Sequence, residues 1–345
     1  MGFKRIISAV DSHTEGEPAR VVVGGIPVIP GNTFKEKWLW AKKNLDDIRT
    51  LLLFEPRGSN IMSGSIITAP CTPGADVGVI YIEVSGFLPM CGHGTIATCT
   101  VLVETGMVEA KEPYTDLTLD TPAGLVRAHI RVQDGQVQHV TIQNVPSFLY
   151  KSDLVVDVPS LGKVKLDIAY GGNFYAIVPA ESVGLELAPT RSKEIVRIGN
   201  LIRDAIFDLG IEVVHPENPE INRCSHVRFI SASPTPGVTT RNAVLYSAEA
   251  IDRSPCGTGT SAEMAYRHAK GLQKLNEEII SESIIGSVFY GNLIEETRVG
   301  SLPAVIPTIR GRAFISGLQQ FVLDPRDPWP HGFFLGEHSR WGTEL

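Results

Sequence analysis

The sequence predicts an α+β protein of two similar domains, each a curved β-sheet around a central helix. The first observation is an internal repeat: residues 91–97 read Cys-Gly-His-Gly-Thr-Ile-Ala, and residues 256–262 read Cys-Gly-Thr-Gly-Thr-Ser-Ala. The second is one long amphipathic segment per half, over residues 34–50 and 191–209. The third is the number of short apolar segments between turn residues, which does not suit the regular alternation of a parallel doubly wound sheet.

In the first half, the segment 34–50 is rich in Lys, Trp, Leu and Asp and predicts a helix. A second helix is expected over residues 95–104, directly after the first copy of the repeat. Its polar residues are nearly all threonines, so we expect it to be buried. Short strands are expected near residues 4–10, 19–23, 51–54, 61–68 and 77–84, with more of them over 116–145.

In the second half, isoleucine, leucine and alanine keep a helical period over residues 191–209. The helix after the second cysteine is expected over residues 260–270. Strands are expected near residues 153–157, 163–169, 226–231, 242–246, 278–290, 293–298 and 305–316. We place the N-terminal domain at residues 1–146 and the C-terminal domain at residues 147–319, with the tail from about residue 320 to 345 returning to the first domain.

The bulk composition narrows the class of function. The 345 residues carry a formal net charge of −7, which argues against nucleic acid or an anionic membrane as a partner. No apolar run reaches the length of a membrane span, and the N-terminal residues do not resemble a secretory signal, so we expect a cytoplasmic protein. The cysteines are five, an odd number, without C-x-x-C spacing, so we expect neither a disulfide framework nor a metal site.

Each copy of the repeat predicts a cysteine at the start of a helix. Gly106 lies fifteen residues after Cys91 and Gly271 fifteen after Cys256, and glycine just past a helix end is a common terminator. Unpaired backbone N–H groups and the helix dipole at such a position favour a thiolate, so we expect lowered thiol pKa values. The same N–H groups suit a carboxylate ligand, and the glycines allow close approach. Cys71, Cys99 and Cys224 lack this context and are interpreted as structural.

Two thiols aimed at opposite faces of one α-carbon suit the inversion of a stereocentre beside a carboxylate. One thiolate removes the α-proton while the other thiol returns a proton from the opposite side. Hydrogen-bond donors focused on the carboxylate would stabilise the developing enediolate. The sequence contains no Walker A segment, no G-x-G-x-x-G after a strand and no recognisable metal or pyridoxal cluster, so we expect no cofactor.

The sequence resembles the proline racemase family. The resemblance rests on Met-Cys-Gly-His-Gly at residues 90–94 and Asp-Arg-Ser-Pro-Cys-Gly-Thr-Gly at residues 252–259, and covers essentially the whole chain. It implies a diaminopimelate-epimerase-like fold with the active site in the cleft between two similar domains, usually in a homodimer, and cofactor-independent catalysis. It implies Cys91 and Cys256 as the acid/base pair. The contacts that it implies for the substrate carboxylate and amine are Gly92, His93, Asp252, Gly257 and Thr258. Further similar segments follow in the same order, at residues 11–18, 55–58, 171–174 and 282–287.

The two cysteines also select a branch of that family by resemblance. Members that dehydrate trans-3-hydroxyproline carry Thr at the second cysteine position, and some 3-hydroxyproline epimerases carry Ser at the first. His226 falls where hydroxyproline epimerases place a substrate-contacting His, while Tyr246 falls where proline racemases place Phe. The favoured hypothesis is an isomerase, a 4-hydroxyproline 2-epimerase acting on trans-4-hydroxy-L-proline. Proline racemase is the alternative, followed by a trans-3-hydroxyproline dehydratase and a non-catalytic amino-acid-binding protein.

Overall fold

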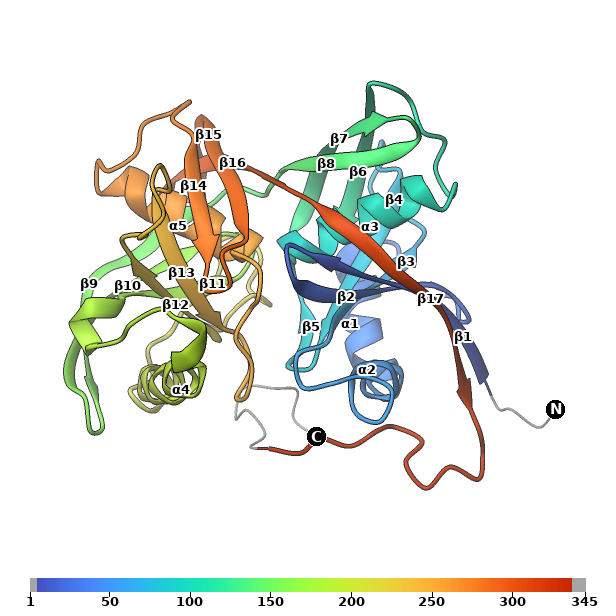
Figure 1. The fold of residues 1–345 in the computed structure, drawn as a ribbon, viewed down its shortest axis with the longest axis horizontal. Helices are drawn as coiled ribbons and strands as arrows, with labels where there is room; N and C mark the ends of the chain where they lie inside the picture. Colours follow the sequence, from blue (N-terminus) through green and yellow to red (C-terminus); the bar gives the residue numbers. More distant parts are fainter. Residues whose placement is uncertain (1–4, 337–345) are drawn as a thin grey trace. The chain divides into compact units, whose positions relative to one another are not determined.

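The structure is a computed structural model that describes residues 5–336 (Figure 1). The chain divides into two compact units. The first unit contains residues 5–142 and 312–336 of the described part, and the second contains residues 143–311. We describe each unit by itself. No helix within the described range is both long and apolar enough to cross a membrane.

The first unit is a mixed sheet around one buried helix. Its strands pair in the order β17–β1–β2–β3–β4–β6–β7, antiparallel except for the β2–β3 and β4–β6 pairs, and β5 adds a short hairpin to β4. Helix α3 (Gly92–Glu104) lies against β1, β2, β3 and β17, and all of its residues but the last are buried. The strands are β1 (Arg5–Thr14), β2 (Glu17–Gly24), β3 (Ser63–Thr68), β4 (Val77–Glu83), β5 (Gly86–Leu88), β6 (Tyr114–Thr121), β7 (Gly124–Gln133), β8 (Gln136–Gln143) and β17 (Ala313–Leu323).

Two helices rather than one connect β2 to β3. They are α1 (Phe34–Asn44) and α2 (Asp46–Leu53), so the single helix expected over residues 34–50 and the strand expected near residues 51–54 are both wrong. The helices separate at Leu45, whose φ of −121° is not helical. The second helix restarts with Asp46 and Asp47 in its first turn, where acidic side chains complement the helix dipole. The three consecutive leucines at residues 51–53 suggested a strand in the sequence, but they form the end of α2 and all three are buried.

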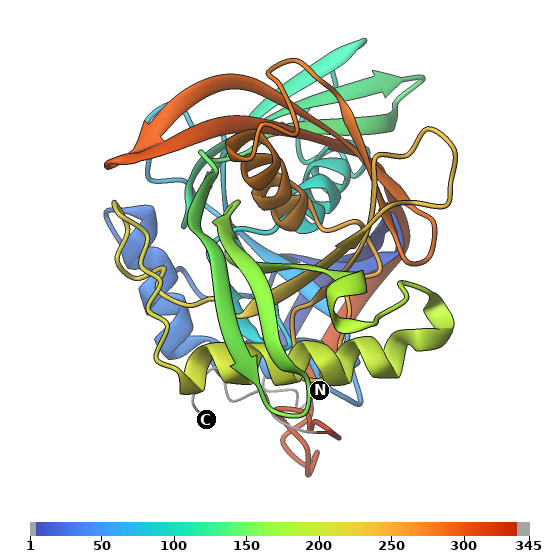
Figure 2. The ribbon, with the colours of Figure 1, turned by 90° about the vertical axis from the view of Figure 1, so that its left-hand side faces the viewer.

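The second unit repeats this plan. Its strands pair in the order β9–β10–β11–β12–β13–β14–β15–β16, antiparallel except for the β11–β12 and β13–β14 pairs. In Figure 2, α5 (Gly257–Ala269) lies inside the curved sheet and α4 (Ser192–Asp208) lies outside it. The strands are β9 (Phe148–Val158), β10 (Gly162–Tyr170), β11 (Phe174–Pro179), β12 (His226–Ser231), β13 (Thr240–Leu245), β14 (Ile279–Ser283), β15 (Val288–Val299) and β16 (Leu302–Gly311). Two short 3₁₀ helices precede α4, over Ala180–Val183 and Pro189–Arg191.

The repeat of the sequence is therefore a repeat of the fold. In each unit, an outer helical connection joins one parallel pair of strands, a hairpin follows, and the cysteine helix joins the next parallel pair. These steps are β2–β3, β3–β4 and β4–β6 in the first unit, and β11–β12, β12–β13 and β13–β14 in the second. Gly106 (φ 73°) and Gly271 (φ 71°) follow α3 and α5, which confirms the predicted helix ends.

Two strand boundaries near the C-terminus differ from the sequence expectation. The expected strand at residues 278–290 is broken between β14 and β15, where Gly286 has a φ of 86°. The expected strand at residues 305–316 is two strands, because β16 ends at Gly311 in the second unit and β17 begins at Ala313, paired with β1 in the first. The expectation for residues 337–345 lies outside the described part of the chain.

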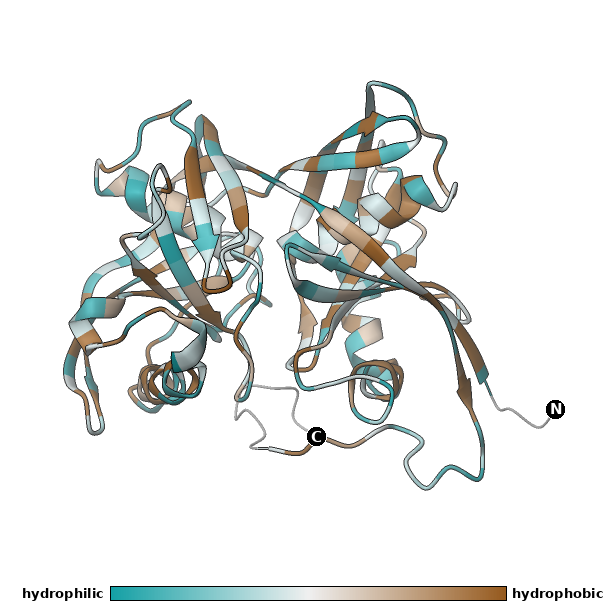
Figure 3. Ribbon diagram, viewed as in Figure 1, coloured by the Kyte–Doolittle hydropathy of each residue, from teal (hydrophilic) through white to brown (hydrophobic). Residues whose placement is uncertain are grey.

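Apolar strands on both sides of the cysteine helices form the two cores (Figure 3). All seven residues of β4 are buried, because α3 and the α1–α2 pair cover the sheet from both sides. In the second unit, β11 is buried along nearly its whole length in the same way. Helix α3 packs against β1, β2, β3 and β17, and α5 packs chiefly against β9, β10 and β16, so each cysteine helix is held inside its own sheet.

Candidate active site: two cysteines at helix starts

Cys91 is the N-cap residue of α3. The helix begins at Gly92, three residues before the expected Thr95, so the thiol lies at the helix start itself. Its backbone is extended (φ −144°, ψ 112°), and its Sγ accepts a hydrogen bond from the N–H of Gly94 at 3.3 Å. A sulfur in this position takes the role that an oxygen plays in an ordinary N-cap, and receives the positive end of the helix dipole.

His93 and a chain of hydroxyl groups surround the first cysteine. The imidazole Nδ1 of His93 lies 3.3 Å from Cys91 Sγ, and the hydroxyl of Thr14 donates to the His93 carbonyl at 2.8 Å. The hydroxyl of Thr95 donates to the Cys91 carbonyl at 2.7 Å and lies 2.5 Å from the hydroxyl of Tyr81. The backbone on both sides of this thiol is therefore held by buried side chains of β1 and β4.

Cys256 is the matching residue at the start of α5, with a different backbone. Its φ of 63° and ψ of 102° lie in a region that side-chain-bearing residues rarely adopt. The Cys256 N–H donates to Ser254 Oγ at 3.1 Å, and its carbonyl accepts from the N–H of Thr260 at 2.7 Å. A positive φ in such a residue costs free energy, so the surrounding contacts must hold it in place.

Asp252 organises the loop before the second cysteine. One carboxylate oxygen accepts from the N–H of Ser254 at 2.8 Å and from its hydroxyl at 2.7 Å, so Asp252 is linked through Ser254 to the Cys256 backbone. Its carboxylate is buried. A hollow of about 500 Å³ borders this loop at Asp252 and Arg253. Cys256 does not line that hollow.

Tyr175 connects the second thiol to His226. Its hydroxyl lies 3.4 Å from Cys256 Sγ and 2.6 Å from Thr258 Oγ1, and the amide of Asn173 donates to the same threonine hydroxyl at 3.4 Å. Tyr175 on β11 is the register partner of His226 on the parallel strand β12, and their ring centroids are 5.0 Å apart. His226 Nδ1 lies 2.9 Å from Ser225 Oγ.

Burial determines the protonation states of Cys256 and His226. Burial first, and then the charge of Asp252, raise the pKa of Cys256 to about 12, although Arg228, the Tyr175 hydroxyl and the Gly259 backbone act in the opposite direction. The lowered thiol pKa expected from the helix start is therefore wrong for Cys256 in the absence of substrate. Burial also lowers the pKa of His226 to about 3, with the charge of Arg203 adding to the effect, so its imidazole is neutral.

The glycine three residues after each cysteine leaves room for the thiol. A Cβ placed on Gly94 would lie 3.0 Å from Cys91 Sγ, and one placed on Gly259 would lie 3.0 Å from Cys256 Sγ. Real Cβ atoms rarely come so close, so a side chain at either position would press on the sulfur, and at Gly259 it would also press on Arg228 Nη1, at 3.0 Å. This explains why both copies of the repeat keep glycine three residues after the cysteine.

The structure places the expected site residues in two groups. Cys91, Gly92 and His93 lie together at the start of α3, and Cys256, Gly257 and Thr258 lie together at the start of α5. Asp252 is joined to the second group through Ser254, and His226 through Tyr175. Cys99 and Cys224 are buried, and burial raises the pKa of each to about 12, as it does for Cys256, so their structural role stays a prediction.

Sequence reasoning missed Tyr175, Arg228 and Glu263. Arg228 on β12 forms a fully buried ion pair with Glu263 on α5, at 2.7 Å. A signal for both was present, because each is a charged residue inside an apolar segment, Arg228 between Val227 and Phe229, Glu263 between Ala262 and Met264. No group of three or more His, Cys, Asp or Glu side chains that could hold a metal ion occurs within residues 5–336.

A family model described as proline racemase matches residues 9–334, which is almost the whole chain. The chain belongs to the proline racemase family. Within this family, it is 54% identical over 335 residues to a 4-hydroxyproline 2-epimerase of Streptosporangium roseum, covering 97% of this chain and 100% of the relative. It is 45% identical over 335 residues to a proline racemase of Clostridioides difficile, with the same two coverages.

A solved structure of the family is also similar throughout. It is a hydroxyproline epimerase from Agrobacterium vitis with bound trans-4-hydroxy-L-proline, 37% identical, with a TM-score of 0.93 over 99% of this chain and 98% of that one. The diaminopimelate-epimerase-like α+β class expected from the sequence is thereby confirmed. Both kinds of relative are racemases or epimerases, so the family supports an isomerase and leaves the substrate to be argued from the site.

Proposed function

We propose that this protein is a 4-hydroxyproline 2-epimerase that converts trans-4-hydroxy-L-proline to cis-4-hydroxy-D-proline, with Cys91 and Cys256 as the proton-transfer pair. The observation that carries this proposal is the duplicated half-site, in which a buried cysteine occupies the N-cap of a buried helix in each unit. The relative from Streptosporangium roseum, 54% identical, supports the same activity. Packing alone would not require two thiols in matching positions beside glycine-rich helix starts.

The reaction is a proton exchange at C2 of the imino acid. One cysteine thiolate takes the C2 proton and becomes a thiol, and the electron pair left behind is delocalised into the carboxylate. The other thiol then gives its proton to the opposite face of C2 and becomes the thiolate. Nothing is oxidised or reduced, and the two sulfurs exchange roles in each turnover. Because Cys256 has a raised pKa when substrate is absent, we expect the cationic imino nitrogen of bound substrate to assist its ionisation.

The carboxylate and the imino nitrogen would be bound by the residues around the thiols. Gly92, His93, Gly257 and Thr258 lie in the first turns of α3 and α5, where backbone N–H groups are available to an anion. Asp252 lies four residues before Cys256 in the same loop. Its buried carboxylate supplies a negative charge that suits the cationic imino nitrogen of the substrate. These assignments follow the positions of the residues and are part of the proposal.

His226 favours a hydroxylated ring over proline. As a neutral imidazole it has one donor and one acceptor nitrogen, and Nδ1 lies against Ser225 Oγ. We propose that Nε2 forms a hydrogen bond with the ring hydroxyl of the substrate. Proline would leave this buried group unpaired, and a site built to bind a hydroxyl discriminates strongly against the analogue that lacks it. The Clostridioides difficile relative keeps proline racemase as the second candidate.

The test is C2 proton exchange followed by NMR in heavy water, with trans-4-hydroxy-L-proline and L-proline assayed in parallel under reductant. The proposal predicts exchange and epimerisation with hydroxyproline, and a kcat/KM for proline that is lower by more than about tenfold. Equal or faster turnover of proline would make the protein a proline racemase. Exchange with neither substrate, or loss of water from a 3-hydroxyproline, would overturn the assignment.

We further propose that the protein works as a cytoplasmic homodimer without a cofactor. The support is membership of the family, for which the sequence resemblance implied these properties. Light scattering at assay concentration should give a mass near twice the 37.5 kDa of the chain. A mass of one chain with full activity would contradict the dimer, and activity abolished by a metal chelator and restored by metal would contradict the absence of a cofactor.

A further inference from the structure

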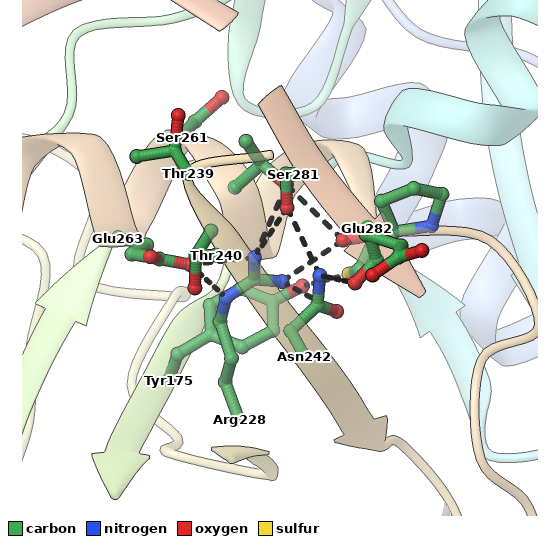
Figure 4. Close-up of polar contacts among 12 residues, drawn as sticks. Tyr175, Arg228, Thr239, Thr240, Asn242, Ser261, Glu263, Ser281 and Glu282 are labelled. Atoms are coloured by element: carbon green, nitrogen blue, oxygen red, sulfur yellow. Dashed lines mark hydrogen bonds and ion pairs between the residues drawn. The ribbon is translucent and has the colours of Figure 1, made fainter. Parts of the chain in front are cut away.

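Arg228 is the centre of a buried hydrogen-bond network in the second unit (Figure 4). Its side chain is fully buried and comes from β12. Both Nε and Nη2 donate to the same oxygen of Glu263, at 2.9 and 2.7 Å. Nη2 also donates to Thr260 at 3.3 Å and to Ser281 at 3.0 Å. Nη1 donates to Asn242 Oδ1 at 3.1 Å and to the carbonyl of Pro255 at 2.9 Å. One guanidinium therefore joins β12, β13, β14, α5 and the loop that precedes α5.

The contact with Pro255 is the one that bears on Cys256. A carbonyl and the following N–H belong to one planar peptide unit, so a bond to the Pro255 carbonyl also fixes the plane of the Cys256 N–H. Arg228 and the Thr260 hydroxyl both donate to that carbonyl, at 2.9 and 3.1 Å. The positive φ of Cys256 is the rotation about the next bond, relative to this plane. The Arg228 network thus fixes the peptide plane that precedes the strained φ angle of Cys256.

The first unit has no ion pair at the matching positions. Arg228 is the third residue of β12, and Ser65 is the third residue of β3. Glu263 lies seven residues after Cys256, and Thr98 lies seven residues after Cys91. Ser65 and Thr98 form a neutral hydroxyl pair at 2.8 Å. Cys91 correspondingly has an ordinary extended backbone. The ion pair and the strained cysteine therefore occur together, in the second unit.

We propose that Arg228, held in place by Glu263, is a positioning residue for Cys256 alone, fixing its peptide plane and placing a buried positive charge beside its thiol. The proposal rests on the proposed role of Cys256 as a proton-transfer group. Its consequence is that the two thiols are tuned separately, although the repeat makes them look equivalent. A buried Arg–Glu pair contributes little net stability compared with an apolar replacement, so its presence here is better explained by this local role.

The charges near the Cys256 thiol predict the direction in which each substitution should change its ionisation. Asp252 disfavours the thiolate, while Arg228 and the Tyr175 hydroxyl favour it. Glu263 offsets part of the charge of Arg228 through their ion pair. Weakening Arg228 should therefore make Cys256 a poorer thiolate, and neutralising Glu263 should make it a better one. A role confined to packing would not give opposite signs for the two substitutions.

The experiment measures alkylation of each cysteine by iodoacetamide across pH 6–10, without substrate, with peptide mass spectrometry to separate the sites. Arg228→Lys keeps a charge but loses the planar fork, and we expect it to slow labelling of Cys256 at pH 8 about tenfold. Glu263→Gln keeps the shape of its side chain, and we expect it to speed labelling of Cys256. Labelling of Cys91 in the same samples is the internal control and should stay within about twofold.

Ser65→Ala is the matched control in the first unit, and we expect it to leave Cys256 labelling unchanged. The proposal is overturned if Arg228→Lys and Glu263→Gln change the labelling rate of Cys256 in the same direction. It is also overturned if the labelling rate of Cys91 changes together with that of Cys256. If Arg228→Lys does not fold, Glu263→Gln alone still decides, because faster labelling of Cys256 alone is required. Since no substrate is used, the test stands apart from the proposed function, which fails only in the exchange assay.

Discussion

The hydroxyl of Tyr175 lies 3.4 Å from the sulfur of Cys256 and 2.6 Å from the hydroxyl of Thr258. The same tyrosine is the register partner of His226 on the neighbouring parallel strand. One side chain therefore touches a thiol at which the reaction is proposed and lies beside the residue proposed to recognise the substrate ring. The chemistry and the specificity of the second unit depend on the same β11–β12 pair.

Tyr175→Phe should raise the pKa of Cys256, because the tyrosine hydroxyl favours its thiolate. We expect kcat/KM at pH 7.5 to fall about tenfold and to recover at alkaline pH, as a pH–rate profile would show. Tyr170→Phe is the control, because the Tyr170 hydroxyl is buried without a hydrogen-bond partner among the described residues. An unchanged profile for Tyr175→Phe would remove the hydroxyl from the mechanism.

His226→Val should change the substrate rather than abolish the chemistry. Removing the imidazole deletes the proposed bond to the ring hydroxyl and leaves an apolar surface that suits proline. We expect kcat/KM for trans-4-hydroxy-L-proline to fall by more than about tenfold and the value for L-proline to be kept or increased, measured by exchange into heavy water. Equal losses for the two substrates would reduce His226 to part of the scaffold.

The buried neutral state of His226 should also appear in the acid stability. The pKa of His226 in the folded protein is about 3, below the ordinary value of 6.5. Between about pH 6.5 and pH 3, His226 is therefore protonated in the unfolded chain and neutral in the folded protein, so lowering the pH favours unfolding. At pH 5.5, this residue should cost about 1.4 kcal/mol of unfolding free energy relative to pH 8. His226→Gln should remove that loss in urea titrations at the two pH values, whereas His129→Gln, at an exposed position, should not. Parallel pH dependence of wild type and His226→Gln would contradict the buried neutral state.

The glycines three residues after each cysteine offer a test that separates stability from activity. Gly94→Ala and Gly259→Ala should improve helix propensity by up to about 1 kcal/mol, while the new Cβ displaces the thiol. We expect a thermal midpoint that is kept and a kcat that falls more than about tenfold, because small misplacements of reacting groups are costly. Gly24→Ala is the control, where a Cβ would meet its nearest neighbour at 3.8 Å. Full activity in both helix variants would show that the thiols tolerate movement.

Local signals in the sequence were sufficient for the repeat, the two cysteine helices and their glycine ends. A cysteine followed by two glycines and a helix-stopping glycine is readable because all of its parts lie within sixteen residues. The end of α2, at residues 51–53, was mistaken for a strand because three consecutive leucines give no period, and only the tertiary burial of all three decides between helix and strand. The division between β16 and β17 depends on the pairing of β17 with β1, whose paired residues Arg5 and Leu323 lie at opposite ends of the described chain.

The site residues that belong to one short sequence motif could be predicted, and those that meet only through the fold could not. Cys91, Cys256 and the residues beside them follow from the repeat. Arg228 and Glu263 are 35 residues apart and meet only because α5 packs inside the sheet that contains β12. The pKa of Cys256 was predicted in the wrong direction, because the helix start was visible in the sequence and the depth of burial was not.

The most direct test of the two-cysteine mechanism is C2 exchange in heavy water by Cys91→Ser and Cys256→Ser, each assayed with both C2 epimers of 4-hydroxyproline. We expect epimerisation to fall about a thousandfold or more in each variant while the urea midpoint is kept, and any residual exchange to be confined to opposite epimers in the two variants. Cys99→Ala, which removes a buried cysteine two turns further along α3, should keep its turnover. Substantial epimerisation by either serine variant would contradict the proposed pair.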